Sequence, residues 1–124
     1  MKNLKSATAK MGNYTFNKVL DTTASGIQLS QWKTINYIEE AANLMQKRLN
    51  GNLPADASME VKSINMDLGP ISGKGERLLI RAQFFAQNKN ALQLKIFLHE
   101  QMKKGKACRI ALAVYDINIT RPAA

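Results

Sequence analysis

A single amphipathic helix followed by four long strand patterns is the feature that most restricts how this chain can fold. Apolar residues recur at helical spacing from about Gln31 to Leu49 and form one stripe. Ser30 is a suitable N-cap, and Asn50-Gly51 before Pro54 predicts where the helix ends. The members of the stripe are Ile35, Ile38, Ala41, Ala42, Met45 and Leu49. This helix is the only element able to cover the apolar face of a sheet made from the strands.

The strand patterns cover residues 57–68, 76–87, 91–100 and 107–119, and a shorter pattern at 14–20 precedes the helix. Turn-forming residues separate the last three strands, which predicts an antiparallel meander. The residues expected on its inner face are Leu78, Ile80, Ala82, Phe84, Leu92, Leu94, Ile96, Leu98, Cys108, Ile110, Leu112 and Val114. We therefore predict an α+β fold in which a long central helix is wrapped by a curved antiparallel sheet of about five strands. Such a sheet leaves exposed edges, so a homodimer is expected, with a tetramer as a further option.

Length and composition are those of one ordinary globular domain. The 124 residues are 45% hydrophobic and 22% charged, so the chain can bury one core. We predict a loose lead-in at residues 1–12, a single domain at 13–120 and a frayed tail at 121–124. We find no secretory signal pattern and no apolar run of membrane-spanning length, so a cytoplasmic location is expected. The single Cys108 excludes an internal disulfide and a cysteine-based zinc site, and no metal site is expected.

The formal net charge of +9 indicates attraction to polyanions. A solvated basic surface, the phosphates of a small molecule such as coenzyme A, and nucleic acid are three explanations that the charge leaves open. Nucleic acid ranks below coenzyme A, because the aromatic residues are expected to be mostly buried and no helix-turn-helix or zinc-finger spacing is present. Among the aromatics, Trp32 is expected to pack near the start of the helix.

The segment before the helix and the middle of the helix carry the candidate motif. Asp21 opens a turn-like segment, Asp-Thr-Thr-Ala-Ser-Gly-Ile, and the helix carries the adjacent carboxylates Glu39 and Glu40 before Ala41. Together these residues resemble the signature of the hotdog-fold acyl-CoA thioesterases related to 4-hydroxybenzoyl-CoA thioesterase. In that family, Asp-x-Asp-x-x-Gly precedes a helix with Glu-x-Ala. Thr23 stands here at the second Asp of the signature, so the catalytic motif is degenerate.

The resemblance implies a hotdog fold and hydrolysis of an acyl-CoA-type thioester at a pocket between two subunits. That reaction needs a group that activates water, and donors for the developing oxyanion. The implied catalytic residues are Glu39 as the base, Asp21 at the first Asp position, and Thr23 and Ser25 to position water or substrate. The expected substrate-binding residues are Gly26 and Ile27 before the helix, Asn65 on the strand after it, and Lys74 and Arg77 near the phosphates. No cofactor is expected beyond the coenzyme A of the substrate.

Other interpretations stay open beside the thioesterase. The protein could bind acyl-CoA or another small ligand without turnover, or it could be a basic nucleic-acid-associated protein. Glu39 and Glu40 could be solvated helix carboxylates, and Thr23 and Ser25 could only stabilise a turn. His99 is expected to face solvent, which disfavours a hotdog-type dehydratase because that class relies on a buried histidine.

Overall fold

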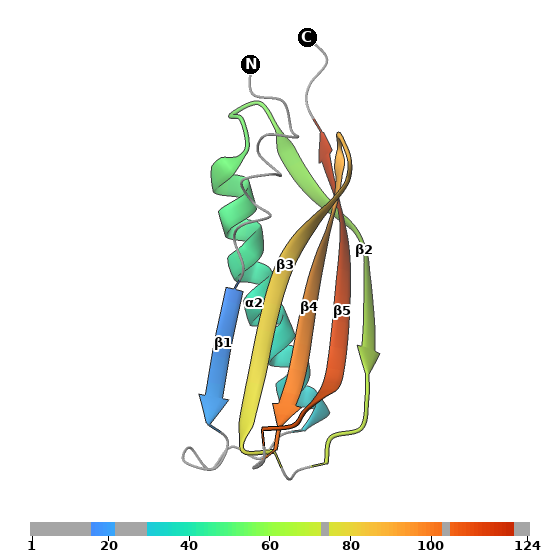
Figure 1. Ribbon diagram of the computed structural model, residues 1–124. Coiled ribbons are helices and arrows are strands. Elements are labelled where there is room, and N and C mark those ends of the chain that lie inside the picture. Colours follow the sequence, from blue (N-terminus) through green and yellow to red (C-terminus); the bar gives the residue numbers. More distant parts are fainter. Residues whose placement is uncertain (1–15, 22–29, 73–74, 103–104, 121–124) are drawn as a thin grey trace.

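One helix and one antiparallel sheet make up the part of the chain that the computed structural model describes, residues 16–21, 30–72, 75–102 and 105–120 (Figure 1). The elements are β1 (Phe16–Asp21), α2 (Gln31–Asn52), β2 (Ser58–Leu68), β3 (Arg77–Asn88), β4 (Ala91–Gln101) and β5 (Ala107–Thr120). The strand order is β1-β3-β4-β5-β2, and all neighbours are antiparallel. Figure 1 shows the sheet curving along α2. The predicted α+β architecture, with β3, β4 and β5 as a meander, is confirmed.

The core lies between α2 and the inner face of the sheet. On β3 and β4 alternate residues are buried, and apart from Glu100 they are the residues predicted from the alternation. Burying one such leucine or isoleucine contributes about 1.5–3 kcal/mol. The predicted helix stripe is also confirmed, although Ile35 is only half-buried. The buried residues of α2 are Thr34, Ile38, Ala41, Ala42, Met45 and Leu49.

The inner face of β5 differs from the prediction. Leu112 and Val114 are half-buried on the outer face, and Cys108 is exposed. Ile110 has no partner in the register of β4 with β5, so it acts as one extra residue that shifts the alternation. Both faces of this strand are apolar, and alternation therefore did not determine which face is buried. The buried residues of β5 are Ile110, Ala111, Ala113, Tyr115, Ile117 and Ile119.

Helix α2 begins as predicted but ends later. The Ser30 side chain accepts a hydrogen bond from the Lys33 backbone N–H at 3.2 Å, which confirms the N-cap. The predicted end at Asn50-Gly51 is wrong, because α2 continues to Asn52 and Leu53 is its C-cap. Leu53 precedes Pro54 and has extended backbone (φ −80°, ψ 151°), as the proline ring requires of its preceding residue. The proline therefore ends this helix, and the glycine does not.

The two edge strands differ in length. β1 has 6 residues, whereas β2 has 11 and contains a register shift between Val61 and Ser63. A long edge strand exposes a row of unpaired backbone groups that can pair with another strand.

Within the described residues, no helix has the length and apolar character needed to cross a membrane.

Candidate active site

The two adjacent carboxylates at the middle of α2 meet different environments. Glu40 lies on the β1 side, where its Oε1 accepts a hydrogen bond from Lys18 Nζ at 3.1 Å. Glu39 is exposed, and its charge acts on Tyr115 of β5. The pKa of Tyr115 is raised, first by burial and then by this carboxylate. Successive residues of a helix point in directions about 100° apart. Glu40 is therefore held in an ion pair on one side of α2, whereas the adjacent Glu39 faces the other edge of the sheet.

A groove follows the side of α2 that carries Glu39. Residues three or four apart share one helix face, and Glu39 lies one turn before Asn43, the first residue of the groove. The groove has a volume of about 480 Å³ and is lined by Asn43, Gln46, Lys47 and Asn50 of α2 and by Met59 of β2. We call this side of the helix, with Glu39, Asn43, Gln46 and Asn50, the β2 flank, and the side with Glu40 the β1 flank.

Apolar side chains are exposed along the β2 flank. Ile64 and Met66 of β2 keep 52% and 36% of their surface exposed, although their register with β5 places both on the inner face. Trp32, two helical turns before Glu39, is 77% exposed, so the expectation that it packs near the helix start is wrong. The outer edge of β2 has no partner strand in the described sheet. Exposed apolar groups beside an unpaired strand edge are typical of a protein interface.

The structure brings together only part of the predicted site. Asp21 is the last residue of β1, and its Cα pairs with that of Arg77 on β3. Asn65 is exposed and pairs with Val114, which places it on the outer face of the sheet, away from Glu39. The predicted residues that lie outside the described part of the chain are Thr23, Ser25, Gly26, Ile27 and Lys74. Their roles, like those of Asp21 and Asn65, stay predictions.

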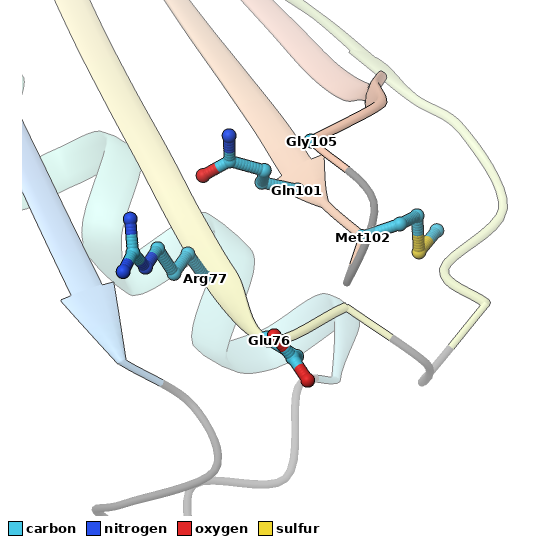
Figure 2. Close-up of a pocket in the computed structure, with 5 residues that line it drawn as sticks. All are labelled: Glu76, Arg77, Gln101, Met102 and Gly105. Atoms are coloured by element: carbon cyan, nitrogen blue, oxygen red, sulfur yellow. The ribbon is translucent and has the colours of Figure 1, made fainter.

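Arg77 lines a small pocket at the end of the sheet where β3 begins and β4 ends (Figure 2). The pocket has a volume of about 180 Å³ and is lined by Glu76, Arg77, Gln101, Met102 and Gly105. In Figure 2 the Arg77 side chain lies on the β1 side of β3, whereas Glu76 extends from the end of the sheet. A guanidinium suits a phosphate group, but the carboxylate of Glu76 weakens the attraction of this pocket for an anion.

A buried carboxylate that the sequence reasoning missed fixes the connection between β2 and β3. Glu100 of β4 is 1% exposed and accepts hydrogen bonds from the Ser72 N–H (3.2 Å), the Ser72 hydroxyl (2.8 Å) and the Gly75 N–H (3.1 Å). Gly75 has no room for a side chain, because a Cβ there would overlap Cγ of Glu100. The signal was present in the sequence, since the alternation Leu92 to Leu98 continues inward to Glu100. Its bonds to the loop indicate a structural role.

His99 lies on the outer face of the sheet, as expected from the alternation, and is half-buried. Its pKa is lowered, first by burial and then by the nearby charge of Arg109, so the imidazole is neutral at pH 7. The sheet separates it from Glu39. In residues 16–21, 30–72, 75–102 and 105–120, no three His, Cys, Asp or Glu side chains are grouped so that they could hold a metal ion.

Comparison with known proteins identifies the fold. No protein-family model and no curated protein matches the sequence. A thioesterase family protein from Silicibacter pomeroyi matches with a TM-score of 0.57 at 13% identity, over 92% of this chain and 88% of that one. A mutant of 4-hydroxybenzoyl-CoA thioesterase in complex with 4-hydroxybenzoyl-CoA matches with a TM-score of 0.58 at 7% identity, over 89% and 86%. A hot-dog-like protein from Thermanaerovibrio acidaminovorans gives 0.54 at 11%, over 88% and 82%.

The chain therefore has the hotdog fold that the sequence motif predicted, and its structural neighbours include thioesterases of that fold. At these identities the likeness concerns the fold. What the chain does has to be argued from its own side chains.

Proposed function

We propose that this protein hydrolyses an acyl-CoA-type thioester, with Glu39 as the catalytic base, in a pocket that is completed when two copies associate along the β2 flank. The thioesterase neighbours support the reaction class. The observation that carries the proposal is the position of Glu39: it is an exposed carboxylate whose charge acts on Tyr115, and Tyr115 pairs across the sheet with Ile64, an exposed apolar residue of β2.

Glu39 would activate a water molecule that attacks the thioester carbonyl carbon. A carboxylate can take the proton of that water as the carbon–oxygen bond forms, and the thiolate of coenzyme A then leaves and is protonated. Tyr115 is protonated at neutral pH, as any tyrosine is, and its raised pKa strengthens this, so its hydroxyl can donate a hydrogen bond beside Glu39. Backbone N–H groups at Gly26 and Ile27, just before α2, are the proposed donors for the oxyanion.

A homodimer would turn the open β2 flank into an enclosed site. Pairing of the β2 edges from two copies would satisfy the unpaired backbone groups of this strand. It would also cover Ile64 and Met66, the exposed apolar residues of β2. Apolar walls suit an acyl chain, and the net charge of +9 suits the coenzyme A phosphates. Arg77 alternates with the buried Leu78 and pairs with β1, so it lies on the outer face away from this flank, and its predicted phosphate contact is not part of the proposed site.

A second candidate function is binding of acyl-CoA without turnover. Thr23 stands where the resembling family has the second carboxylate of its motif, and a hydroxyl is a weaker base than a carboxylate. The fold and the pocket would then serve to hold the thioester, and Glu39 would contribute only to binding.

Release of free thiol from a panel of acyl-CoAs separates the two candidates. Hydrolysis predicts turnover of at least one acyl-CoA by the wild-type chain and its loss in Glu39→Ala. The measurement is paired with titration calorimetry of coenzyme A and of a non-hydrolysable acyl-CoA thioether. Tight binding of the thioether with no thiol release from any substrate would leave the binding function standing. Neither binding nor release would remove both candidates.

A further inference from the structure

We propose that the outer face of the sheet, on the side away from α2, binds single-stranded nucleic acid. The site is separate from the thioester site, because the sheet lies between them. Its centre is Phe97 on β4, the middle strand of the five. The Phe97 ring would stack on an unpaired base, and Arg81, Lys95 and Arg109 would contact the phosphates on either side.

The register of the strands places three basic residues on the outer face near Phe97. Phe97 is half-buried, so part of its surface is open to solvent. Arg81 of β3 stands directly opposite it, and Lys95 is the preceding residue of β4 on the same face. Arg109 of β5 pairs with His99, the next outward residue of β4. Neighbouring strands are about 4.8 Å apart, so the aromatic group and its cations lie on a surface only three strands wide.

The acidic residues that the register places on this face are not direct neighbours of Phe97: Asp21 lies at the end of β1, and the others lie toward β2. Asp116 accepts hydrogen bonds from Ser63 at 2.7 Å and from Gln93 at 2.9 Å, and Asp67 lies on β2 itself. These two hydrogen bonds hold the pKa of Asp116 below its usual value. The residues next to Phe97 across the sheet and along β4 are Arg81, Leu112, Lys95 and His99. A partner at Phe97 therefore meets positive charge, and an anionic partner is favoured.

The arrangement of the rings favours an unpaired base. Lys95 Nζ lies 5.0 Å from the centre of the Phe85 ring, so a cation already covers Phe85 and Phe97 is the ring next to the arginines. An aromatic side chain can stack on the open face of a base in a single strand, whereas the bases of a duplex are stacked on each other. The expectation that the aromatics are mostly buried is thus wrong for these two phenylalanines.

A second copy of the chain fits this face less well. Its outer face would bring like charges against Arg81, Lys95 and Arg109, and like charges across an interface are unfavourable. The net charge of +9 agrees with attraction of a polyanion to the molecule as a whole.

Fluorescence anisotropy of a labelled oligothymidylate, measured over a series of KCl concentrations, tests the proposal. The face variant is Arg81→Gln/Lys95→Gln/Arg109→Gln. Its matched control, Lys33→Gln/Lys89→Gln/Lys106→Gln, removes the same charge from exposed positions elsewhere. The face variant is expected to bind about 30-fold more weakly at low salt, and the slope of log affinity against log salt should fall by about 2. Phe97→Leu should weaken binding about tenfold. The control should bind within about twofold of the wild type.

Several results would overturn the proposal. Equal loss in the face variant and its control would mean that net charge alone attracts the oligonucleotide. Tighter binding of a duplex would exclude base stacking, and binding of polyglutamate but not of oligothymidylate would point to an acidic protein. Dissociation of a tetramer by the face variant, seen by light scattering, would make this face a contact between copies. Failure here is distinguishable from failure of the thioesterase, because Glu39→Gln should bind the oligonucleotide like the wild type.

Discussion

The two flanks of α2 differ in how their carboxylates are surrounded, although both belong to the same helical turns. On the β1 flank, Glu40 is bonded to Lys18 and the short strand β1 lies alongside. On the β2 flank, Glu39 is exposed, a groove of about 480 Å³ follows the helix, and Ile64 and Met66 keep apolar surface in contact with water. On the β1 flank the carboxylate has a partner within the chain, whereas the β2 flank has the exposed apolar groups that are typical of a protein interface.

The difference shows how a fold can give two adjacent residues different roles. Glu39 and Glu40 have the same side chain, but they point in different directions from the helix axis and meet different neighbours. The carboxylate of Glu40 already accepts a hydrogen bond from Lys18, so it is engaged within the chain. The carboxylate on the open flank keeps its oxygens available for a ligand or a water molecule.

The largest effect, on self-association, is expected when a charge is placed on β2 beside the β2 flank. Ile64→Asp should weaken self-association by about 3 kcal/mol or more, because the charge would be buried without a partner. Val19→Asp on β1 is the matched control, since Val19 is 59% exposed and Ile64 52%. Sedimentation equilibrium of both variants measures the effect. If the two variants associate equally well, the β2 flank is not the interface.

Replacement of Glu100, which holds a loop, should affect stability more than replacement of Glu39, the proposed catalytic base. Glu100→Ala should lower the free energy of unfolding by about 1–3 kcal/mol, because the hydrogen bonds from Ser72 and Gly75 to this buried carboxylate are lost. Glu39→Ala should change it by less than about 0.5 kcal/mol, as for an ordinary surface position. Urea unfolding followed by circular dichroism gives both values. A comparable loss in Glu39→Ala would assign that residue to the fold and not to a site.

The phenol of Tyr115 reports on which carboxylate lies beside it. Glu39→Gln should lower the raised pKa of Tyr115 toward 10.0, because the nearby negative charge is removed, and Glu40→Gln should leave it unchanged. Tyrosinate absorbance against pH, with Tyr115→Phe to identify the signal, measures the shift. The raised pKa also means that the fold favours the neutral phenol, so stability is full below pH 10.0 and falls as the pH rises through the folded pKa. A larger shift in Glu40→Gln would contradict the assignment of the flanks.

The smallest effect is expected when the ion pair of the β1 flank is removed. Lys18→Met removes an exposed ion pair whose side chains retain 36% and 62% of their surface. Such pairs contribute about 0–1 kcal/mol, so the free energy of unfolding should change little and hydrolysis should not change at all. Thermal unfolding at low and high salt is the check. A loss of activity in this variant would show that the β1 flank takes part in the site.

Much of the fold could be predicted because hydrophobic periodicity determined the faces of α2, β3 and β4. The prediction was wrong at β5, where both faces are apolar and Ile110 adds a residue, and at the helix end, where Pro54 and not Gly51 stops the helix. Glu100 was missed because a charged residue on a buried face contradicts the usual pattern, although its position in the alternation was clear.

The site was less predictable for a different reason. The sequence singled out the pair Glu39 and Glu40, and a resemblance favoured the first, but no local pattern shows where each carboxylate points. That depends on Lys18 and Tyr115, which lie far from α2 in the sequence and reach it only through the sheet. In the proposed site, the acyl group would be selected by side chains from two copies, and the pattern of one sequence does not show which of them meet.

The rate of thioester hydrolysis by Glu39→Gln and by Glu40→Gln, measured side by side with the same acyl-CoA, is the most direct test of the difference between the flanks. Removal of a general base lowers a rate by about 100-fold or more, and this loss in kcat/KM is expected for Glu39→Gln alone. Glu40→Gln should retain nearly the wild-type value. Equal rates in the two variants, or a greater loss in Glu40→Gln, would contradict the assignment of the chemistry to the β2 flank.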